Sequence, residues 1–124
     1  MPHPTPHSTP DPAQVLAKAV TRAADQLELP RASLARILGL SPATVTRLYR
    51  GDYRLEPDSK AGELALLLVR LFRSLHSIVG SGDAARAWLA GENLGLNGRP
   101  RELILSAQGL VHVLDYLDAH RARL

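Results

Sequence analysis

The stretch RASLARILGLSPATVTRLYR, residues 31–50, decides the expected fold of the N-terminal half of the chain. Its small and apolar residues follow the spacing of a helix–turn–helix, with Ala35 before Gly39 and Val45 after it. An alanine lets two helices approach closely, and a glycine suits the left-handed backbone of a tight turn between them. The leucines around them would then meet Val45 in the angle between the helices. The stretch therefore predicts two short helices joined by a turn.

The second helix of this pair has a clear start signal. Ser41 is suited to cap it, and Pro42 is suited to its first position because proline lacks the N–H that would be unpaired there. We predict the first helix over residues 31–38 and the recognition helix over residues 42–49. A further helix, starting after a cap at Asp11, is expected to pack behind the pair.

Basic side chains concentrate on this motif. Residues 31–54 hold five arginines against a single aspartate, whereas the rest of the chain is closer to neutral. Val45 and Leu48 are expected to point inward, which leaves the opposite face for the major groove of DNA. Arginine is the most common partner of guanine, and Ser and Thr hydroxyls bind phosphates. The alternative is a solvated, charged helix face. The candidate DNA-binding residues are Arg31, Ser41, Ala43, Thr44, Thr46, Arg47 and Arg50.

The composition favours a helical protein. Of the 124 residues 45% are hydrophobic and only 4% are aromatic. A core built mainly of Leu, Ala and Val favours helices, so we expect an all-α chain of one domain, or of two small domains that share a core. The net charge of +3 is compatible with a nucleic-acid partner. The absence of cysteine excludes disulfides, thiolate metal sites and cysteine nucleophiles.

No targeting or membrane segment is visible in the sequence. The N-terminus is rich in proline and lacks the apolar stretch of a signal peptide. The most apolar run, residues 64–72, is too short to span a bilayer and contains Arg70. We therefore expect a cytoplasmic protein without membrane contact.

The chain is expected to divide into three parts. Residues 1–11 are rich in proline, serine and threonine, which predicts a disordered arm, and His3 and His7 within it are not expected to form a metal site. Residues 12–57 are expected to form the helix–turn–helix domain. Residues 58–124 are expected to form a second, helical domain.

Residues 58–79 predict a long helix with apolar side chains on two sides. Both sides must be covered, and in so short a chain a second copy of the protein is expected to cover one of them. A homodimer would also present two recognition helices to two half-sites. The alternative is a central helix that its own chain wraps completely. The candidate dimer residues are Leu67, Leu71, Phe72 and Leu75.

The C-terminal part predicts shorter helices around a loop. A helix over residues 84–90 carries Trp88, the only tryptophan, which is expected to be a core or interface anchor. A loop dense in glycine and asparagine follows at residues 91–99, and a helical turn at residues 100–105. Ser106 is suited to cap the last helix, which ends in a basic tail.

The stretch AARAWLAGENLGLNGRPRELILSAQGLVHVLDYLDA, residues 84–119, resembles the toxin-binding domain of the Xre/MbcA/ParS antitoxin family. Its most specific feature is the motif N-x-x-L-x-G-x-P, formed here by Asn93, Leu96, Gly98 and Pro100. The resemblance covers roughly the second predicted domain, and the helix–turn–helix in front resembles the Xre-type DNA-binding domain of the same family. It implies an all-α fold in which an Xre-type helix–turn–helix bundle precedes a small helical domain for toxin binding and dimerisation.

This resemblance also implies a function, that of the antitoxin in a type II toxin–antitoxin system. The partner would be a RES-domain toxin, an enzyme that consumes NAD+, and the C-terminal domain would cover its active site. The N-terminal domain would bind operator DNA and repress the antitoxin's own operon. The candidate toxin-binding residues are Asn93, Asn97, Arg99, His120, Arg121, Arg123 and Leu124.

Two segments are candidates for blocking the toxin. In the tail, Arg121 and Arg123 would pair with acidic groups of the toxin, or the terminal carboxylate of Leu124 would occupy a phosphate-binding position. The alternative for the tail is that it is only solvated. The loop at residues 91–99 is the other candidate contact, and its alternative is a plain connector between helices.

A different function remains open from the residues alone, namely a stand-alone dimeric helix–turn–helix repressor whose C-terminal half binds a ligand or only dimerises. Enzymatic activity and a cofactor are not expected, because the sequence holds no metal constellation, Gly-rich phosphate loop or nucleophile elbow. His76, His112 and His120 are scattered along the chain, and Asp115 and Asp118 are expected to lie on the solvated face of a Leu-rich helix.

Overall fold

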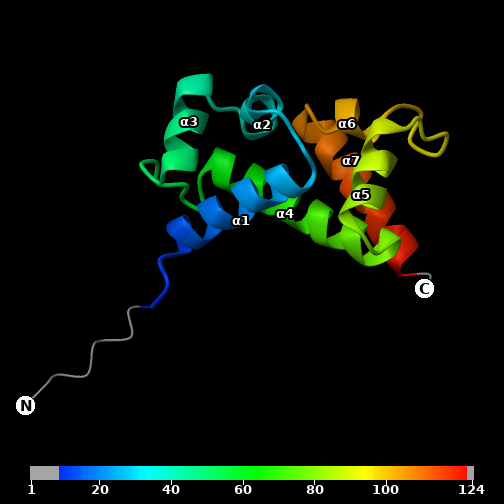
Figure 1. Cartoon of the computed structure of the whole chain (residues 1–124), viewed down its shortest axis with the longest axis horizontal. Coiled ribbons are helices and arrows are strands. Elements are labelled where there is room, and N and C mark those ends of the chain that lie inside the picture. Colours follow the sequence, from blue (N-terminus) through cyan, green and yellow to red (C-terminus); the bar gives the residue numbers. More distant parts are fainter. Residues whose placement is uncertain (1–8, 123–124) are drawn as a thin grey trace, which may run out of the picture.

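The computed structural model describes residues 9–122, and within this range the chain folds into seven helices without a β-strand (Figure 1). The predicted all-α fold is confirmed. The predictions for residues 1–8, including His3 and His7, and those for Arg123 and Leu124 lie outside the described residues. The helices are α1 (Pro12–Gln26), α2 (Arg31–Leu38), α3 (Pro42–Arg50), α4 (Lys60–Val79), α5 (Gly82–Ala90), α6 (Pro100–Leu103) and α7 (Ala107–Arg121).

Side-chain caps start three of these helices where the sequence predicts them. The Oδ1 atom of Asp11 accepts a hydrogen bond from the N–H of Ala13 at the start of α1 (3.1 Å). Ser41 and Ser106 cap α3 and α7 in the same manner, each accepting from the N–H three residues later (3.1 and 3.0 Å). These bonds satisfy N–H groups that have no partner within the helix.

Two helices start at caps that differ from the predicted boundaries. Ser59 caps α4, so this helix begins at residue 60 rather than 58, and Ser81 caps α5, which begins two residues earlier than predicted. The helical turn after Pro100 ends at Leu103, two residues sooner than expected.

The helix–turn–helix forms between α2 and α3 as predicted. Gly39 ends α2 in the left-handed conformation, with φ 68°, and the N–H of Leu40 donates to the carbonyl oxygen of Ala35 (3.0 Å). Ala35 and Val45 are buried where the two helices pack, together with Leu34, Leu38 and Leu48. The predicted turn chemistry and the predicted inward positions are therefore both present.

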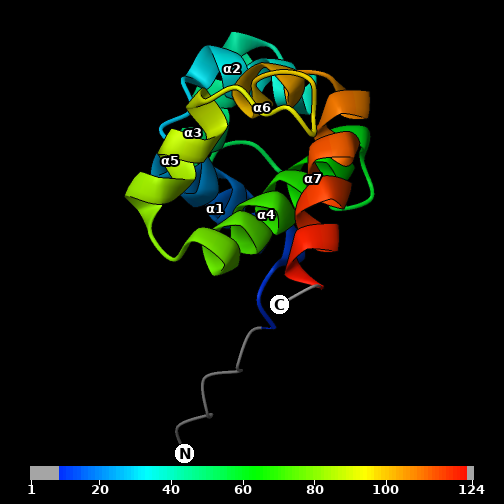
Figure 2. The same ribbon diagram turned by 90° about the vertical axis from the view of Figure 1, so that its right-hand side faces the viewer.

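Helix α4 runs through the middle of the molecule (Figures 1 and 2). It contacts α1 and α2 from the first half of the chain and α5 and α7 from the second. Ser74 on α4 is buried and donates to the carboxylate of Asp118 on α7 (3.1 Å), and Arg70 pairs with the same carboxylate (3.4 Å). Asp118 therefore faces α4 rather than lying on the solvated face expected for it, whereas Asp115 is exposed. The two halves of the chain therefore share one core, with α4 as its centre.

This position of α4 corrects part of the predicted dimer surface. Leu71 and Leu75 are fully buried, because helices of the same chain cover that side of α4. They cannot contact a second chain in this conformation, so their assignment to a dimer interface is wrong. Leu67 and Phe72 are half-buried, and the exposed leucine on α4 is Leu66, with 43% of its surface accessible.

Among the described residues, no single helix has both the length and the apolar character to cross a membrane. Only α4 and α5 taken together meet those criteria, and they are bent by 109° at the break between them.

Candidate functional site

The recognition helix α3 exposes the side that the sequence assigns to DNA. Val45 and Leu48 are buried against the rest of the domain. All seven candidate residues lie at exposed or half-buried positions: Arg31, Ser41, Ala43, Arg47 and Arg50 are exposed, and Thr44 and Thr46 are half-buried. The predicted division of α3 into an inner and an outer face therefore agrees with the burial of its residues.

The hydroxyl groups on this surface are partly engaged within the helix. Ser41 Oγ accepts from the N–H of Thr44 and lies 2.8 Å from Thr44 Oγ1. Thr46 Oγ1 donates to the carbonyl oxygen of Pro42 (3.2 Å). A phosphate oxygen accepts hydrogen bonds, so a hydroxyl must donate its O–H to bind one. Hydroxyls whose O–H is already used within the helix are less available for that contact. The arginines are therefore the stronger candidates for contacts with an anionic partner.

Two tyrosines orient two of these arginines. The guanidinium carbon of Arg31 lies 4.1 Å from the centre of the Tyr49 ring, and that of Arg47 lies 5.9 Å from the centre of the Tyr53 ring. Arg47 also donates to the backbone oxygen of Asp52 (3.3 Å). Such stacking holds a cation over an aromatic face without removing its charge. Nothing in the sequence pattern singles out these tyrosines, because the pairs form only when α2, α3 and the following turn come together.

Tyr49 is itself held in place from α1. Its hydroxyl donates to Asp25 Oδ1 (3.2 Å). Burial, followed by the negative charge of Asp25, raises the pKa of Tyr49 to about 12. The hydroxyl therefore stays protonated at neutral pH and keeps donating to Asp25, which fixes the ring beneath Arg31.

An open cavity of about 410 Å³ lies between α1 and the end of α3. Its lining includes Lys18 of α1 and Arg50 of α3, together with Tyr49 and Tyr53. The positively charged surface therefore extends beyond the recognition helix onto α1. Lys18 is absent from the predicted site because it lies outside the helix–turn–helix stretch in the sequence.

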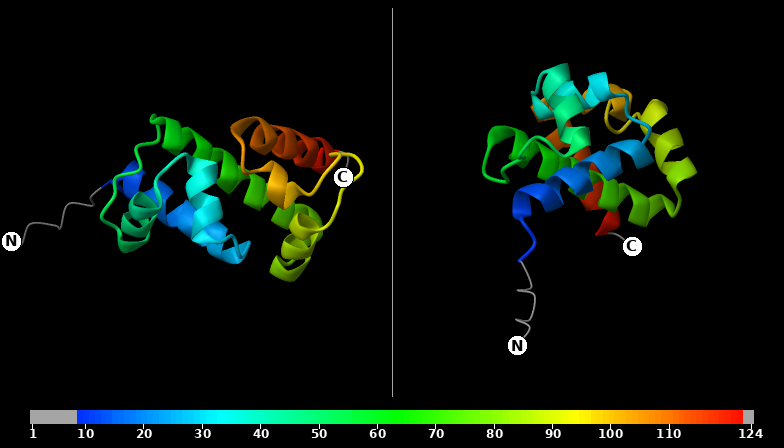
Figure 3. Two further views of the ribbon diagram at one scale, coloured as in Figure 1. Left: turned by 90° about the horizontal axis from the view of Figure 1, so that it is seen from above. Right: turned by 60° about the vertical axis from the view of Figure 1, so that its left-hand side comes forward.

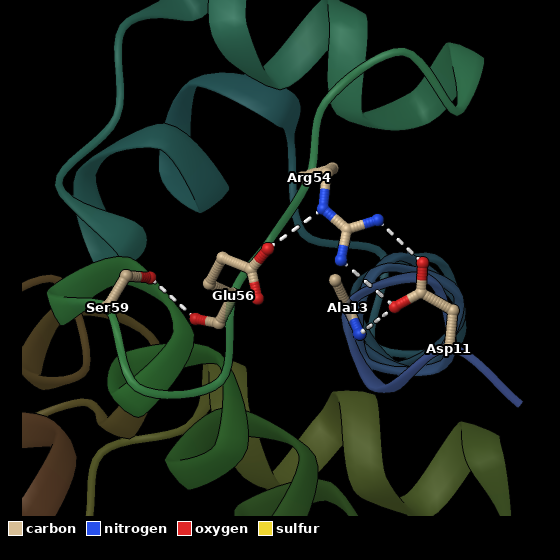
Figure 4. Close-up of polar contacts among 5 residues, drawn as sticks. All are labelled: Asp11, Ala13, Arg54, Glu56 and Ser59. Carbon is tan, nitrogen blue, oxygen red and sulfur yellow. Dashed lines mark hydrogen bonds and ion pairs between the residues drawn. The ribbon is translucent and has the colours of Figure 1, made fainter.

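Arg54 does not add to this free positive charge. Its guanidinium pairs with both carboxylate oxygens of Asp11 (2.6 and 3.2 Å) and with Glu56 Oε1 (2.8 Å), as Figure 4 shows. Hydrogen bonding from Arg54 lowers the pKa of Asp11, and the two carboxylates raise the pKa of Arg54. The Asp11–Arg54 pair ties the start of α1 to the turn after α3.

The acid dependence of this pair yields a prediction for Asp11→Asn. Because the pKa of Asp11 is lowered on folding, its pair stabilises the fold above the ordinary value of 3.8 and stops doing so as the pH falls through the lowered pKa. Asparagine still caps α1. We expect the variant to unfold at a lower urea concentration than the parent at neutral pH, and the difference between their unfolding midpoints to disappear in acid. In an Arg54→Ala background this difference should be small at every pH. If it were as large there as in the parent, the effect would come from something other than the ion pair.

A second surface forms around the loop between α5 and α6. Asn93 and Gly98 exchange two backbone hydrogen bonds (2.9 and 3.2 Å), and Asn93 Oδ1 accepts from the N–H of Leu96 (3.1 Å). Asn97 takes the left-handed backbone, with φ 56°, and Leu96 is buried. The two asparagines predicted to contact a toxin are therefore engaged in shaping the loop itself.

The tip of this loop exposes a leucine. Leu94 is 99% accessible, whereas the other large exposed apolar residues of the described chain are between 42% and 52% accessible. The next residue, Gly95, lies against α7, because a Cβ at this position would be 2.9 Å from Cε2 of Tyr116. Tyr116 of α7 thus supports the loop backbone at Gly95, while the side chain of Leu94 projects into solvent.

Aromatic rings connect the loop to the end of α7. The Tyr116 ring lies 6.3 Å from Trp88 of α5 and 4.2 Å from His120, measured between ring centres. We call Trp88, Leu94, Gly95, Tyr116 and His120 the loop–α7 surface. Tyr116 therefore lies between the loop and His120, and the two segments that the sequence leaves as alternatives, the loop and the start of the tail, lie towards the same end of the molecule (Figure 3, left).

Two other predicted contact residues lie next to this surface. Arg99 is exposed and is 3.9 Å from Glu92, a loose ion pair, and Arg121 is exposed at the end of α7. Helix α3 and the loop at residues 91–99 lie towards opposite ends of the long axis of the molecule (Figure 1). The chain therefore carries two separated surfaces, one basic and one largely apolar and aromatic.

Arg86 on α5 links the second half of the chain to the end of α1 and the segment after it. Arg86 donates to the backbone oxygen of Gln26 (2.8 Å), lies 3.5 Å from the carboxylate of Glu28, and pairs with Asp83 on its own helix.

Within residues 9–122 no group of three or more potential metal ligands comes together.

Comparison with known families finds one matching domain for each of the two surfaces. Residues 6–70 match the antitoxin Xre-like helix-turn-helix domain, and residues 74–123 match the antitoxin Xre/MbcA/ParS C-terminal toxin-binding domain. The search of curated proteins found no match. The first match contains α3 and its arginines, and the second contains the loop–α7 surface. The chain therefore belongs to the Xre/MbcA/ParS family of type II antitoxins, in which a DNA-binding helix–turn–helix domain precedes a toxin-binding domain.

Proposed function

We propose that this antitoxin neutralises a RES-domain toxin that degrades NAD+, by covering the active site of the toxin, and that it represses its own operon in the cytoplasm. The observation that supports the proposal is that the loop at residues 91–99 and α3 lie towards opposite ends of the molecule, because a toxin bound at the loop would leave the DNA-binding surface free. The identity of the toxin rests on the resemblance of the C-terminal half to antitoxins of this kind.

In this proposal the loop–α7 surface provides the contact area and the nearby cations provide the specificity. His120 and Arg121 are exposed at the end of α7, and Arg99 is exposed beside the loop. A toxin that binds a dinucleotide needs groups that recognise phosphates, and its rim can be acidic. Cations at the edge of an apolar contact favour the correct orientation of the partner more than they add affinity.

The proposal is tested by expressing the adjacent gene with and without the antitoxin, while cellular NAD+ and growth are measured. We expect NAD+ to fall when the adjacent gene is expressed alone and to recover when the antitoxin is present. A toxic product that leaves NAD+ unchanged would overturn the RES assignment while leaving the antitoxin function in place.

For the DNA-binding half we propose that a homodimer binds double-stranded operator DNA with one α3 in each of two half-sites. On α4, Leu66 is exposed and Leu67 and Phe72 are half-buried, so these three residues are the remaining apolar candidates on that helix for the contact between copies. Pairing two recognition helices in this way would compensate for the small contact area of each.

The arginines on α3 give a direct prediction for operator binding. Arg47→Ala and Arg50→Ala are each expected to weaken operator binding by about 1–3 kcal/mol if they contact bases, because a bidentate contact to guanine is lost. Electrophoretic mobility shifts or fluorescence anisotropy at several salt concentrations would measure this. Affinity for the toxin should stay unchanged.

Arg54→Ala is the matched control for these variants, because it removes the same side chain a few residues away. The guanidinium of Arg54 already pairs with Asp11 and Glu56, so its loss should change operator affinity little. If Arg54→Ala weakened binding as much as Arg50→Ala, the effect would come from net charge or from the fold rather than from contacts of α3.

A further inference from the structure

We propose that Leu94 is the anchor by which the toxin-binding domain docks, its side chain entering an apolar pocket on the toxin. This inference rests on the proposed function and adds to it the residue that supplies most of the apolar contact. Its position carries the argument: Leu94 is almost completely accessible at the tip of a loop in the middle of the matched toxin-binding domain.

The loop holds this side chain in a defined position before any partner arrives. The backbone bonds between Asn93 and Gly98, the Asn93 side-chain bond to Leu96 and the left-handed turn at Asn97 fix the loop from within. Tyr116 supports it from α7 through its close approach to Gly95. An apolar side chain on a preorganised loop loses little entropy when it is buried by a partner, which is the property of interface anchors.

The choice of residue is also informative. The motif N-x-x-L-x-G-x-P needs Asn93 and Leu96 to form the loop, but the residue between Asn93 and Gly95 makes no contact that the fold requires, since its side chain is exposed. A polar residue at position 94 would serve the fold equally well. Leucine there has an evident use only when something covers it, and within the toxin-binding domain the expected cover is the toxin.

Burying one leucine side chain in an apolar pocket changes affinity by about ten- to a hundredfold. The experiment measures binding of the full-length antitoxin to the product of the adjacent gene, inactivated in its active site, by isothermal titration calorimetry. We expect Leu94→Ala to bind about ten- to a hundredfold more weakly, Leu94→Met to retain nearly full affinity, and all variants to bind operator DNA and melt like the parent.

Val111→Ala is the matched control, because Val111 is an exposed apolar residue (42% accessible) on α7 in the same domain. A loss of affinity confined to Leu94→Ala supports the anchor. Equal affinity of Leu94→Ala and the parent for the toxin overturns it while leaving the antitoxin function intact. A change in oligomeric state by light scattering, with toxin binding unaltered, also overturns it by assigning Leu94 to a contact between copies. If the parent itself does not bind, both the proposed function and the anchor fail.

Discussion

Leu71→Ala is expected to lower the free energy of unfolding by about 2–5 kcal/mol, a large share of the stability of a small protein. Leu71 is fully buried on α4, at the centre of the core shared by both halves. Removing its side chain leaves a cavity that the surrounding helices fill only in part. Chemical denaturation followed by circular dichroism would measure the loss.

The same experiment separates a core residue from an interface residue. If Leu71 packs only within its own chain, the loss of stability persists when the protein is diluted, whereas a lost dimer contact depends on concentration. Leu66→Ala provides the comparison, because Leu66 is on the same helix but is partly exposed. We expect its effect on a monomer to be much smaller. A loss for Leu71→Ala that disappeared on dilution would restore this residue to the dimer surface.

Gly109→Ala is expected to be the most damaging glycine substitution in the toxin-binding domain. A Cβ at this position would lie 1.9 Å from the carbonyl oxygen of Leu103, a backbone atom that cannot move aside without shifting α6. The helical preference of alanine adds about 1 kcal/mol in the opposite direction, and the clash is expected to exceed it, with a net loss of about 1–3 kcal/mol. Thermal melting would report a fall of several degrees.

Gly91→Ala is the control for this variant. Gly91 has φ −85°, which any residue adopts, and a Cβ there would lie 3.4 Å from the carbonyl oxygen of Ala87. We expect a melting temperature close to that of the parent. If Gly109→Ala melted no lower than Gly91→Ala, α6 and the start of α7 would have to be able to separate at little cost.

The local structure was largely predictable, because short-range chemistry determines it. Caps at Asp11, Ser41 and Ser106 and the turn at Gly39 each depend on residues within five positions of one another. Their hydrogen bonds satisfy backbone groups whatever the rest of the chain does. For the same reason the inward positions of α3 follow from the spacing of its apolar residues.

The packing of α4 was not predictable in this way. Its sequence shows apolar residues on two sides, but which of them the chain itself covers depends on where α1, α5 and α7 lie. Leu71 and Leu75 were therefore assigned to the wrong surface. The free positive charge of the helix–turn–helix could not be predicted for the same reason. Arg54 counts as a cation in the sequence, but it is paired with Asp11, which lies 43 positions away.

The residues of the loop–α7 surface were predictable only in part. Asn93, Asn97 and His120 are predicted from a resemblance, and the structure gives the two asparagines a part in shaping the loop. Leu94 and Tyr116 are missed, because the first lies at an unspecified position of the motif and the second reaches the loop only through the fold.

The shared helix α4 also makes the two activities interdependent in a thermodynamic sense. The two matched domains adjoin between residues 70 and 74, inside α4, so neither domain has a complete core without the other. The two surfaces are thus expected to be lost together in one cooperative unfolding transition. A toxin that binds the folded form would then raise the fraction of intact DNA-binding domains even without touching them. Under conditions that partly unfold the free antitoxin, operator occupancy would follow toxin concentration through stability alone.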